Sequence, residues 1–366
     1  MDNGLFSMFS LENIQLNTNA CKNYLNKDVV CQACVESCPT KAIKLVDRLP
    51  TINHSKCTNC GLCISSCEVL AFDNIQKPYS DIHKQITDYP NSNITCDNAS
   101  NHLKGIKVPC YLNIDIYMLM HLSTYRDTVD FYLGDCPSCL RSDLDTVKDH
   151  ILNLQNQLNE LLVPLTIQVY STKLDERNSE VINGLTRREL FQKISLTRFR
   201  NFKFTEEVDL EKNKTNKSLF REKNLFKRRL LNRYFKKREI KLLDAKLIKK
   251  QFTTIRISDS CNGCNICEKV CPTGAVSWKD STGSSSLVFN SHSCISCMKC
   301  NICPESAITF DSISIYDYLD AKEQTLTTFN LVKCKDCGEI FRTNNNENLC
   351  SLCEKKIKQK KVNYFG

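Results

Sequence analysis

Short segments rich in β-branched and aromatic residues alternate with longer segments of helical periodicity in the middle of the chain. The short segments predict strands at residues 93–95, 128–133 and 165–170. Apolar residues at helical spacing predict helices between them, at residues 112–125 and 144–162. Strands that alternate with helices pair in parallel, so this part of the chain predicts a small parallel α/β domain of about 100 residues.

Two other patterns lie nearer the C-terminus. Residues 275–278 and 287–289 are apolar segments separated by a turn rich in serine and glycine, which predicts a β-hairpin. Between residues 217 and 250, large apolar residues recur at roughly helical spacing among lysines and arginines, which predicts an amphipathic basic helix. Its apolar positions are Phe220, Phe226, Leu230, Tyr234, Leu243 and Leu247.

The sequence lacks the signals of export and membrane insertion. No apolar run approaches the roughly 18 residues that span a bilayer. The N-terminal residues lack the basic and apolar regions of a secretory signal, and Tyr364, Phe365 and Gly366 carry no prenylation motif. We therefore expect a soluble cytoplasmic protein with no membrane span.

Cysteine is the most informative residue type in the composition. The chain has 24 cysteines among 366 residues and only 10 glycines. Most of these cysteines have another cysteine three positions away, a spacing that lets both sulfurs of a tight turn face one metal centre. A reducing compartment also disfavours structural disulfides. We therefore expect metal ligation by four successive groups of eight, four, eight and four cysteines.

The second group of eight has the clearest pattern. It consists of Cys261, Cys264, Cys267 and Cys271 followed by Pro272, and of Cys294, Cys297, Cys300 and Cys303 followed by Pro304. Three closely spaced thiolates bind one face of a cubane cluster, and the fourth ligand comes from elsewhere in the chain. The pattern resembles the bacterial two-cluster ferredoxin family, except that Cys300 and Cys303 enclose two residues rather than three.

The ferredoxin resemblance implies two [4Fe–4S] clusters in this group, with the last cysteine of each run serving the other cluster. The implied ligand sets are Cys261, Cys264, Cys267 and Cys303 for one cluster, and Cys294, Cys297, Cys300 and Cys271 for the other.

The first group of eight follows the same pattern with two departures. Nine residues separate Cys21 from Cys31, and Glu68 stands where a proline would follow Cys67. Ala-Ile pairs at residues 42–43 and 307–308 indicate an internal duplication. The same resemblance implies two further [4Fe–4S] clusters, and paired zinc sites are the alternative for both groups. The implied sets are Cys21, Cys31, Cys34 and Cys67, and Cys57, Cys60, Cys63 and Cys38.

The middle group, Cys96, Cys110, Cys136 and Cys139, falls in the predicted α/β domain, and we expect it at the carboxyl edge of the sheet. Three interpretations stay open. Residues 108–110 and 134–136 resemble part of the delta subunit of methyl-viologen-reducing hydrogenases, which implies an additional cluster of the [2Fe–2S] type. Cys136-Pro-Ser-Cys139 is similar to a thioredoxin-type dithiol. Four thiolates also suit zinc.

The last four cysteines form two pairs, Cys334 with Cys337 and Cys350 with Cys353, separated by twelve residues. This arrangement resembles a zinc ribbon, which implies a closed structural zinc site with four thiolate ligands. A rubredoxin-like iron site has the same ligand geometry and is the alternative.

The segment between the two halves of the chain is strongly basic. Residues 185–250 contain 22 lysines and arginines and 8 aspartates and glutamates, a local charge of +14 in a chain of formal charge +9. Three hypotheses stay open for the basic helix in this segment. In the first, the basic face is solvated while the apolar stripe packs on neighbouring domains. In the second, the helix binds an anionic protein. In the third, it binds nucleic acid or a membrane surface.

Motifs for catalysis on an organic substrate are absent from the sequence. There is no Gly-x-Gly-x-x-Gly, Walker or Cys-x3-Cys-x2-Cys motif, and none of the 6 histidines lies beside a candidate nucleophile. We therefore expect no catalytic residues and no small-molecule substrate site in this chain.

Together these patterns predict an α+β multidomain protein. The predicted function is that of an iron–sulfur subunit that passes electrons to or from a cytoplasmic oxidoreductase. The alternative is a nucleic-acid-binding or assembly factor with structural clusters and a zinc ribbon. The expected parts are an N-terminal dicluster ferredoxin-like module (1–78), a four-cysteine α/β domain (79–184), a basic helical linker (185–252), a second dicluster module (253–316) and a zinc-ribbon-like module (317–366).

Overall fold

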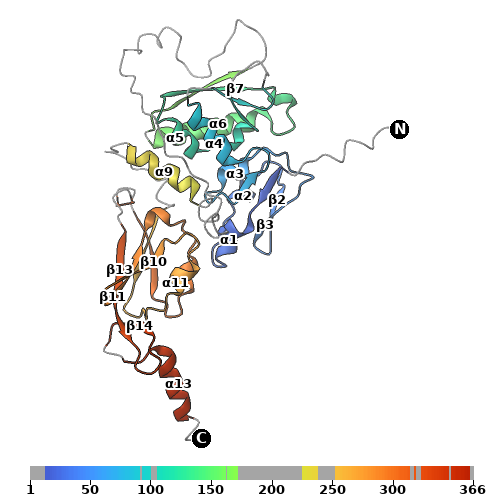
Figure 1. Cartoon of the computed structure of the whole chain (residues 1–366). Helices are drawn as coiled ribbons and strands as arrows, with labels where there is room; N and C mark the ends of the chain where they lie inside the picture. Colours follow the sequence, from blue (N-terminus) through green and yellow to red (C-terminus); the bar gives the residue numbers. More distant parts are fainter. Residues whose placement is uncertain are drawn as a thin grey trace. The chain divides into compact units, whose positions relative to one another are not determined.

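The computed structural model describes residues 13–90, 93–99, 105–161, 163–171, 225–237, 252–313, 317–318, 323–345 and 348–362. The chain divides into two compact units, Met1–Asp244 and Ala245–Gly366 (Figure 1). The first unit holds the first twelve cysteines and the second unit holds the other twelve. Most of the basic segment lies outside the described residues, including the predicted helix positions Phe220, Leu243 and Leu247.

The N-terminal module, residues 13–74, is built from two small antiparallel sheets and three short helices. β1 (Ile14–Leu16) pairs with β4 (Phe72–Asn74), so the two ends of the module meet in one sheet. β2 (Ile43–Val46) and β3 (Leu49–Ile52) form a hairpin whose two turn residues have positive φ, as a tight primed turn requires. The helices are α1 (Lys22–Leu25), α2 (Ala33–Glu36) and α3 (Leu62–Ser66).

The predicted parallel sheet is present in the α/β domain, residues 79–171. Its strand order is β6-β5-β7-β8, and every neighbouring pair is parallel. The strands are β5 (Ile94–Cys96), β6 (Ile106–Val108), β7 (Thr128–Leu133) and β8 (Thr166–Ser171). β6 was not predicted from the sequence, because its three residues alternate one exposed-type lysine with two apolar side chains and do not stand out from the neighbouring loop.

Aspartate caps fix the starts of two helices in this domain. The structure divides the single helix predicted at 112–125 into the 3-10 turn η3 (Tyr111–Asn113) and α5 (Ile116–Leu122). This division arises because the Asp115 side chain accepts a hydrogen bond from the Met118 N–H and begins a new helix. α6 (Leu144–Glu160) begins at its predicted residue after the Asp143 cap, and α4 (Tyr79–Asp88) precedes the sheet.

The described part of the basic segment is α9 (Phe226–Lys237), which packs on α5. Leu230, Leu231, Tyr234 and Phe235 of α9 are buried, so its apolar face lies against the protein. A lysine also lies on this inner face, which the amphipathic pattern did not predict.

Lys227 is that buried lysine, with a side chain only 1% exposed. Its ammonium nitrogen lies 2.8 Å from a carboxylate oxygen of Asp115 and donates hydrogen bonds to the carbonyls of Ile64 and Ser65, at 2.7 and 3.0 Å. The Tyr79 hydroxyl donates to the same carboxylate. One cation therefore connects the basic segment, the N-terminal module and the α/β domain.

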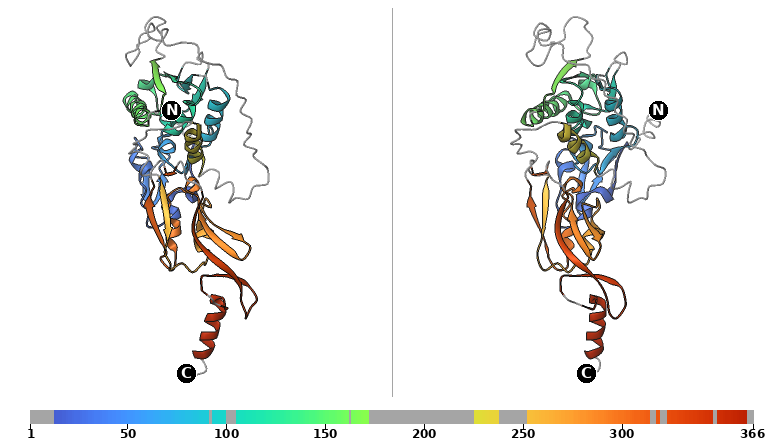
Figure 2. Two further views of the ribbon diagram at one scale, coloured as in Figure 1. Left: turned by 90° about the vertical axis from the view of Figure 1, so that its left-hand side faces the viewer. Right: turned by 60° about the vertical axis from the view of Figure 1, so that its left-hand side comes forward.

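The second unit contains two antiparallel sheets. β9 (Thr253–Ile257) pairs with β12 (Ile308–Ser312), and a four-stranded sheet has the order β10-β11-β13-β14. β10 (Val276–Ser281) and β11 (Ser284–Phe289) form the predicted hairpin between the two cysteine runs. β13 (Gln324–Lys333) and β14 (Ile340–Thr343) extend this sheet, so the hairpin whose turn contains Cys334 and Cys337 is part of the sheet of the second module (Figure 2).

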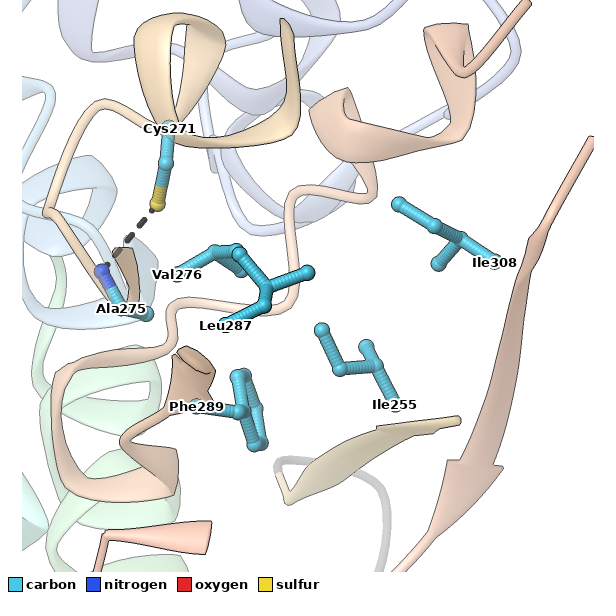
Figure 3. Packing of buried hydrophobic residues seen from close by; sticks show 7 residues of the cluster. All are labelled: Ile255, Cys271, Ala275, Val276, Leu287, Phe289 and Ile308. Atoms are coloured by element: carbon cyan, nitrogen blue, oxygen red, sulfur yellow. Dashed lines mark hydrogen bonds between the residues drawn. The ribbon is translucent and has the colours of Figure 1, made fainter. Parts of the chain in front are cut away.

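Aliphatic and aromatic side chains fill the space between these two sheets. Ile255 of β9 and Ile308 of β12 face Leu287 and Phe289 of β11 (Figure 3). Cys271 belongs to the same buried group, so the cysteine runs and the core are one packed structure. The remaining helices of this unit are α11 (Ile266–Val270), η5 (Ser291–Ser293), η6 (Lys299–Ile302) and α13 (Ser351–Val362).

Among the described residues, no helix has the length and apolar character needed to cross a membrane.

Replacing Lys227 with methionine tests the buried ion pair. We expect Lys227→Met to lower the free energy of unfolding by about 3–5 kcal/mol, because Asp115 would stay buried without its cation. Anaerobic denaturant unfolding of the full chain, followed by circular dichroism, measures this loss. The exposed Arg229 of the same helix is the matched control, and Arg229→Met should change stability by less than about 0.5 kcal/mol. Equal effects of the two substitutions would contradict the role of Lys227.

Candidate metal centres

Four cavities in the structure are each lined by four cysteines. We name them the Cys21, Cys57, Cys261 and Cys294 cavities. Each cavity brings together one of the four sets implied by the ferredoxin resemblance, including the distant fourth cysteine. The lining sets are Cys21, Cys31, Cys34 and Cys67; Cys38, Cys57, Cys60 and Cys63; Cys261, Cys264, Cys267 and Cys303; and Cys271, Cys294, Cys297 and Cys300.

Short helices direct the fourth cysteine of a run away from its neighbours. α3 and α11 follow the second cysteine of their runs, and each ends at the fourth, Cys67 or Cys271. Both terminal cysteines have extended backbone, with ψ of 108° and 114°. The change from helical to extended backbone carries these sulfurs to the other cavity of their module.

All four runs share a turn after the last cysteine. The third residue after it has left-handed backbone, at Lys41, Leu70, Gly274 and Ser306, with φ between 49° and 68°. The fourth residue after it is a buried alanine in every run: Ala42, Ala71, Ala275 and Ala307. This repeated alanine is a sequence signal that the Ala-Ile pairs detected only in part.

This turn places a backbone donor on the sulfur. The N–H groups of Ala42, Ala71 and Ala275 donate to the sulfurs of Cys38, Cys67 and Cys271, each at 3.2 Å (Figure 3 shows the last pair). Hydrogen bonds to ligand sulfurs stabilise negative charge and help to set the reduction potential of an iron–sulfur cluster.

The loops between the first three cysteines of a run also share a backbone conformation. Positive φ occurs at Asn59 and Gly61, at Gly263 and Asn265, and at Ser296 and Met298. Alternation of left-handed and right-handed residues turns successive N–H groups toward an anionic centre. The run that begins at Cys31 has only two closely spaced cysteines before Cys38 and therefore lacks this loop. Cys21 supplies the missing sulfur from upstream in the chain.

Asn23 compensates for the displaced first cysteine. Its side-chain amide, on a residue only 4% exposed, donates to the Cys31 carbonyl at 2.9 Å and accepts from the Cys31 N–H at 2.7 Å. It also donates to the Arg48 carbonyl at 3.0 Å. This buried clamp holds the Cys21 segment beside the Cys31 loop and was not predicted from the sequence.

Burial and crowding disfavour the charged form of these thiols. Burial raises the pKa of the Cys34 thiol to about 12, with additional contributions from charge on Cys67, Cys31 and Cys21. Burial likewise raises the pKa of Cys267 to about 11. Thiolates in such cavities require compensating positive charge, which iron supplies in a ferredoxin-type cluster.

Trp278 is the large aromatic residue in the lining of the Cys261 cavity. Its ring lines this cavity, and its buried Nε1–H has no hydrogen-bond partner among the described residues. The guanidinium carbon of Arg342, on β14, lies 4.1 Å from the ring centroid, a cation–π contact. The Cβ of Arg342 also lies against Gly263 of the cysteine loop. The C-terminal hairpin therefore covers this metal centre.

The middle four cysteines meet at the carboxyl edge of the parallel sheet, where the sequence placed them. Cys96 is the last residue of β5, Cys110 follows β6, and Cys136 and Cys139 follow β7. Cys96, Cys110 and Cys136 are 6–7% exposed, and Cys139 is half-buried.

A thioredoxin-type dithiol is disfavoured at this edge. Reactive dithiols depend on a depressed pKa at a helix N-terminus. Here Cys136 begins only the three-residue turn η4 (Cys136–Ser138), and burial raises the pKa of its thiol to about 11, with additional contributions from Cys96, Cys139 and nearby carboxylates.

The last four cysteines have a tighter geometry. The sulfurs of Cys334, Cys337, Cys350 and Cys353 all lie within 4.8 Å of one another. Cys337 Sγ and Cys350 Sγ are 3.8 Å apart, the separation expected for tetrahedral bonds of about 2.3 Å to zinc. Backbone N–H groups lower the pKa of Cys334 to about 6, and one of them, from Cys350, donates at 3.3 Å. This group could hold a metal ion.

Comparison with known families supports the assignment of the two eight-cysteine groups. A family model for a 4Fe-4S dicluster domain matches residues 29–71 and 260–307. These ranges include fifteen of the sixteen cysteines of the two groups and leave out Cys21, the middle four and the last four. No curated protein matches the chain. The chain thus carries two dicluster ferredoxin-like modules, which indicate iron–sulfur electron transfer.

Serine substitutions test the crossed arrangement of the cysteines. We expect Cys271→Ser and Cys300→Ser to alter the same spectroscopic species, and Cys267→Ser to alter a different one, because Cys271 lines the cavity of the following run. Electron paramagnetic resonance of the reduced, reconstituted protein separates these species. If Cys271→Ser and Cys267→Ser change the same species, the crossed arrangement is wrong.

Trp278→Phe tests the unpartnered indole donor. The substitution keeps an aromatic ring under Arg342 but removes the N–H group, so the reduction potential of the species altered by Cys267→Ser should fall. A net hydrogen bond of about 1 kcal/mol in the reduced state corresponds to about 40 mV for one electron. A redox titration measures the shift. Phe310→Leu, in the lining of the Cys294 cavity, is the control and should leave this potential unchanged. An unchanged potential in Trp278→Phe would show that the indole N–H does not act on the cluster.

Proposed function

We propose that this chain is an iron–sulfur electron-transfer subunit that exchanges electrons with a cytoplasmic oxidoreductase. In this proposal the four cysteine-lined cavities hold one [4Fe–4S] cluster each, with the cavity sets as ligands. A [4Fe–4S] cluster supplies one-electron oxidation and reduction. The substrate chemistry then belongs to the partner enzyme.

The observation that carries the proposal is the assembly of four complete cysteine sets from crossed runs. A structural zinc pair would not need the exchange of a fourth ligand between two three-cysteine loops. The alanine N–H groups at Cys38, Cys67 and Cys271 add donors that favour the reduced, more negative state.

The two cavities of the N-terminal module are electrostatically coupled. Burial raises the pKa of Cys63 well above its usual value, and charge on the three other cysteines of its own cavity adds to this effect. Cys34 of the Cys21 cavity contributes as well. Addition of charge in one cavity is therefore felt in the other, as expected of neighbouring centres in an electron-transfer path.

The second unit has an exposed surface suited to electron exchange. Cys264 is exposed, and the apolar side chains of Met298 and Ile302 are 39% and 65% exposed next to Cys297 and Cys303. Exposed apolar residues around a redox centre favour a protein partner over solvent. We propose this surface as a docking site for the oxidoreductase.

We further propose that Cys334, Cys337, Cys350 and Cys353 bind one structural zinc ion. The sulfur spacing supports this assignment, and the β13–β14 hairpin, whose turn contains Cys334 and Cys337, covers Trp278. In this arrangement the zinc ion stabilises the hairpin, and the hairpin shields the Cys261 cavity.

Metal analysis combined with a redox titration tests the function. In the anaerobically reconstituted full chain, the two modules should contribute about 16 irons, and each of their four clusters should take up one electron reversibly. The reduced protein should then pass electrons to a co-purifying oxidoreductase, and excess nucleic acid should not compete. Zinc should be present at one ion per chain.

Two results together would overturn the electron-transfer function. The clusters would never change redox state at accessible potentials, and the protein would bind nucleic acid tightly at physiological salt. Cys300→Ser is the matched control for the redox titration. It should alter only the cluster of the Cys294 cavity and leave the other three unchanged.

A further inference from the structure

The α/β domain contains a third kind of cysteine site, at the edge where three parallel strands end. We propose that Cys96, Cys110, Cys136 and Cys139 bind an additional iron–sulfur cluster, a fifth redox centre that adjoins the Cys57 cavity of the N-terminal module. This inference rests on the proposed function, because a further redox centre extends an electron path that the two modules begin.

The loops that carry these cysteines are held against one another. Asp97 N–H donates to the Val108 carbonyl at 2.9 Å, which joins the ends of β5 and β6. The Asn98 side chain donates to the Asp135 carbonyl at 3.0 Å, which joins the loops after β5 and β7. A methyl group at Gly134 would overlap the Asn98 backbone, so this approach requires glycine. The sheet edge therefore brings the loops together before any metal binds.

Arg141 connects the same loops from the far side of the site. Its guanidinium group donates to the Asp97 carboxylate at 2.8 Å and also to the Pro109 carbonyl. Asp97 forms a second ion pair with Lys77. A single arginine, two residues after Cys139, thus fixes the residue after Cys96 and the residue before Cys110. These contacts hold the cysteine-bearing loops together, as expected of a preformed binding site.

The sulfur spacing separates a polynuclear cluster from a zinc ion. Within the described part of the chain, only the group at residues 334–353 brings three or more candidate ligand atoms within 4.8 Å of one another. No three of the middle sulfurs lie within 4.8 Å of one another, and the same is true of each of the four cavities assigned to the dicluster modules. A tetrahedral zinc ion needs sulfurs about 3.8 Å apart, so the wider spacing fits a cluster of several irons.

Two buried polar side chains beside the site have unused hydrogen-bonding capacity. Asn113 is fully buried, and neither its Nδ2 nor its Oδ1 has a partner among the described residues. The same holds for the hydroxyl of Thr95, which precedes Cys96. Asn113 lies on the turn of Cys110, whose carbonyl accepts its N–H at 3.0 Å. Buried polar groups almost always have a partner. Ligand or bridging sulfurs would supply acceptors for the two donors among these groups, the Asn113 amide N–H and the Thr95 hydroxyl.

The site lies directly beside the Cys57 loop of the N-terminal module. Thr58 Oγ1 donates to the Arg141 carbonyl and Ser65 Oγ donates to the Leu112 carbonyl, each at 2.7 Å. Gly61 approaches Asn113 so closely that a methyl group there would overlap the amide. A cluster at the middle site would therefore neighbour the cluster in the Cys57 cavity.

Iron, sulfide and zinc analysis of the full chain and of Cys139→Ser tests the proposal. Cys139 is half-buried, so serine should not disturb the fold, which circular dichroism verifies. We expect the variant to lose two or four irons per chain, depending on the cluster type, and one Mössbauer species, while zinc stays at one ion. Ser138→Ala, an exposed position in the same turn, is the matched control and should lose neither.

Electron paramagnetic resonance of the reduced protein tests the position of the site. The species altered by Cys60→Ser should show spin–spin broadening in the reduced full chain, and Cys110→Ser should narrow it. Loss of zinc rather than iron in Cys139→Ser would overturn the proposal, as would an unchanged metal content. A broadening that Cys110→Ser leaves unchanged would overturn the placement beside the Cys57 cavity.

These outcomes are distinct from a failure of the proposed function. If the module clusters bind iron but never change redox state, the proposed function fails, while the iron count of Cys139→Ser still decides the middle site. If the modules behave as expected and Cys139→Ser loses zinc or nothing, only the inference about the middle site fails.

Discussion

The cost of burying negative charge on cysteine sulfurs is the constraint on which both units depend. A cavity lined by four cysteines has little water to stabilise negative charge, and each thiolate raises the pKa of its neighbours. The thiol cavities are therefore stable as ligand sets only when positive charge enters them. Folding and metal binding are then coupled, as in other small metal-binding domains, whose cores are too small to be stable alone.

The architecture of each module follows from the positions that the cysteine sulfurs must reach around two separate centres. Three cysteines at intervals of three residues form a loop that surrounds one centre, and a short helix with an extended end carries the next sulfur to the second centre. The left-handed residue and the buried alanine after it bring an N–H group onto that sulfur. In the Cys21 cavity one ligand comes from a cysteine displaced upstream. Asn23 holds the segment of that cysteine beside the Cys31 loop.

Contacts within the first unit extend this order beyond the module. The cation of Lys227 binds two carbonyls of α3, the helix that contains Cys63, and pairs with Asp115 at the start of α5. The hydroxyls of Thr58 and Ser65 reach the α/β domain near Cys110. A ligand loop of the module and the cysteine edge of the sheet are thereby fixed relative to each other.

The sequence alone determined the local features, because these depend on residues close together in the chain. Cysteine spacing defined the two dicluster modules, and apolar periodicity defined β7, the start of α6 and the hairpin of β10 and β11. The parallel order of the sheet followed from alternation of strands and helices. Only the tertiary structure placed Lys227 against Asp115, Asn113 against Gly61, and Arg342 over Trp278. These partners are tens of residues or more apart, and neither periodicity nor spacing encodes which buried polar groups will meet once the chain has folded.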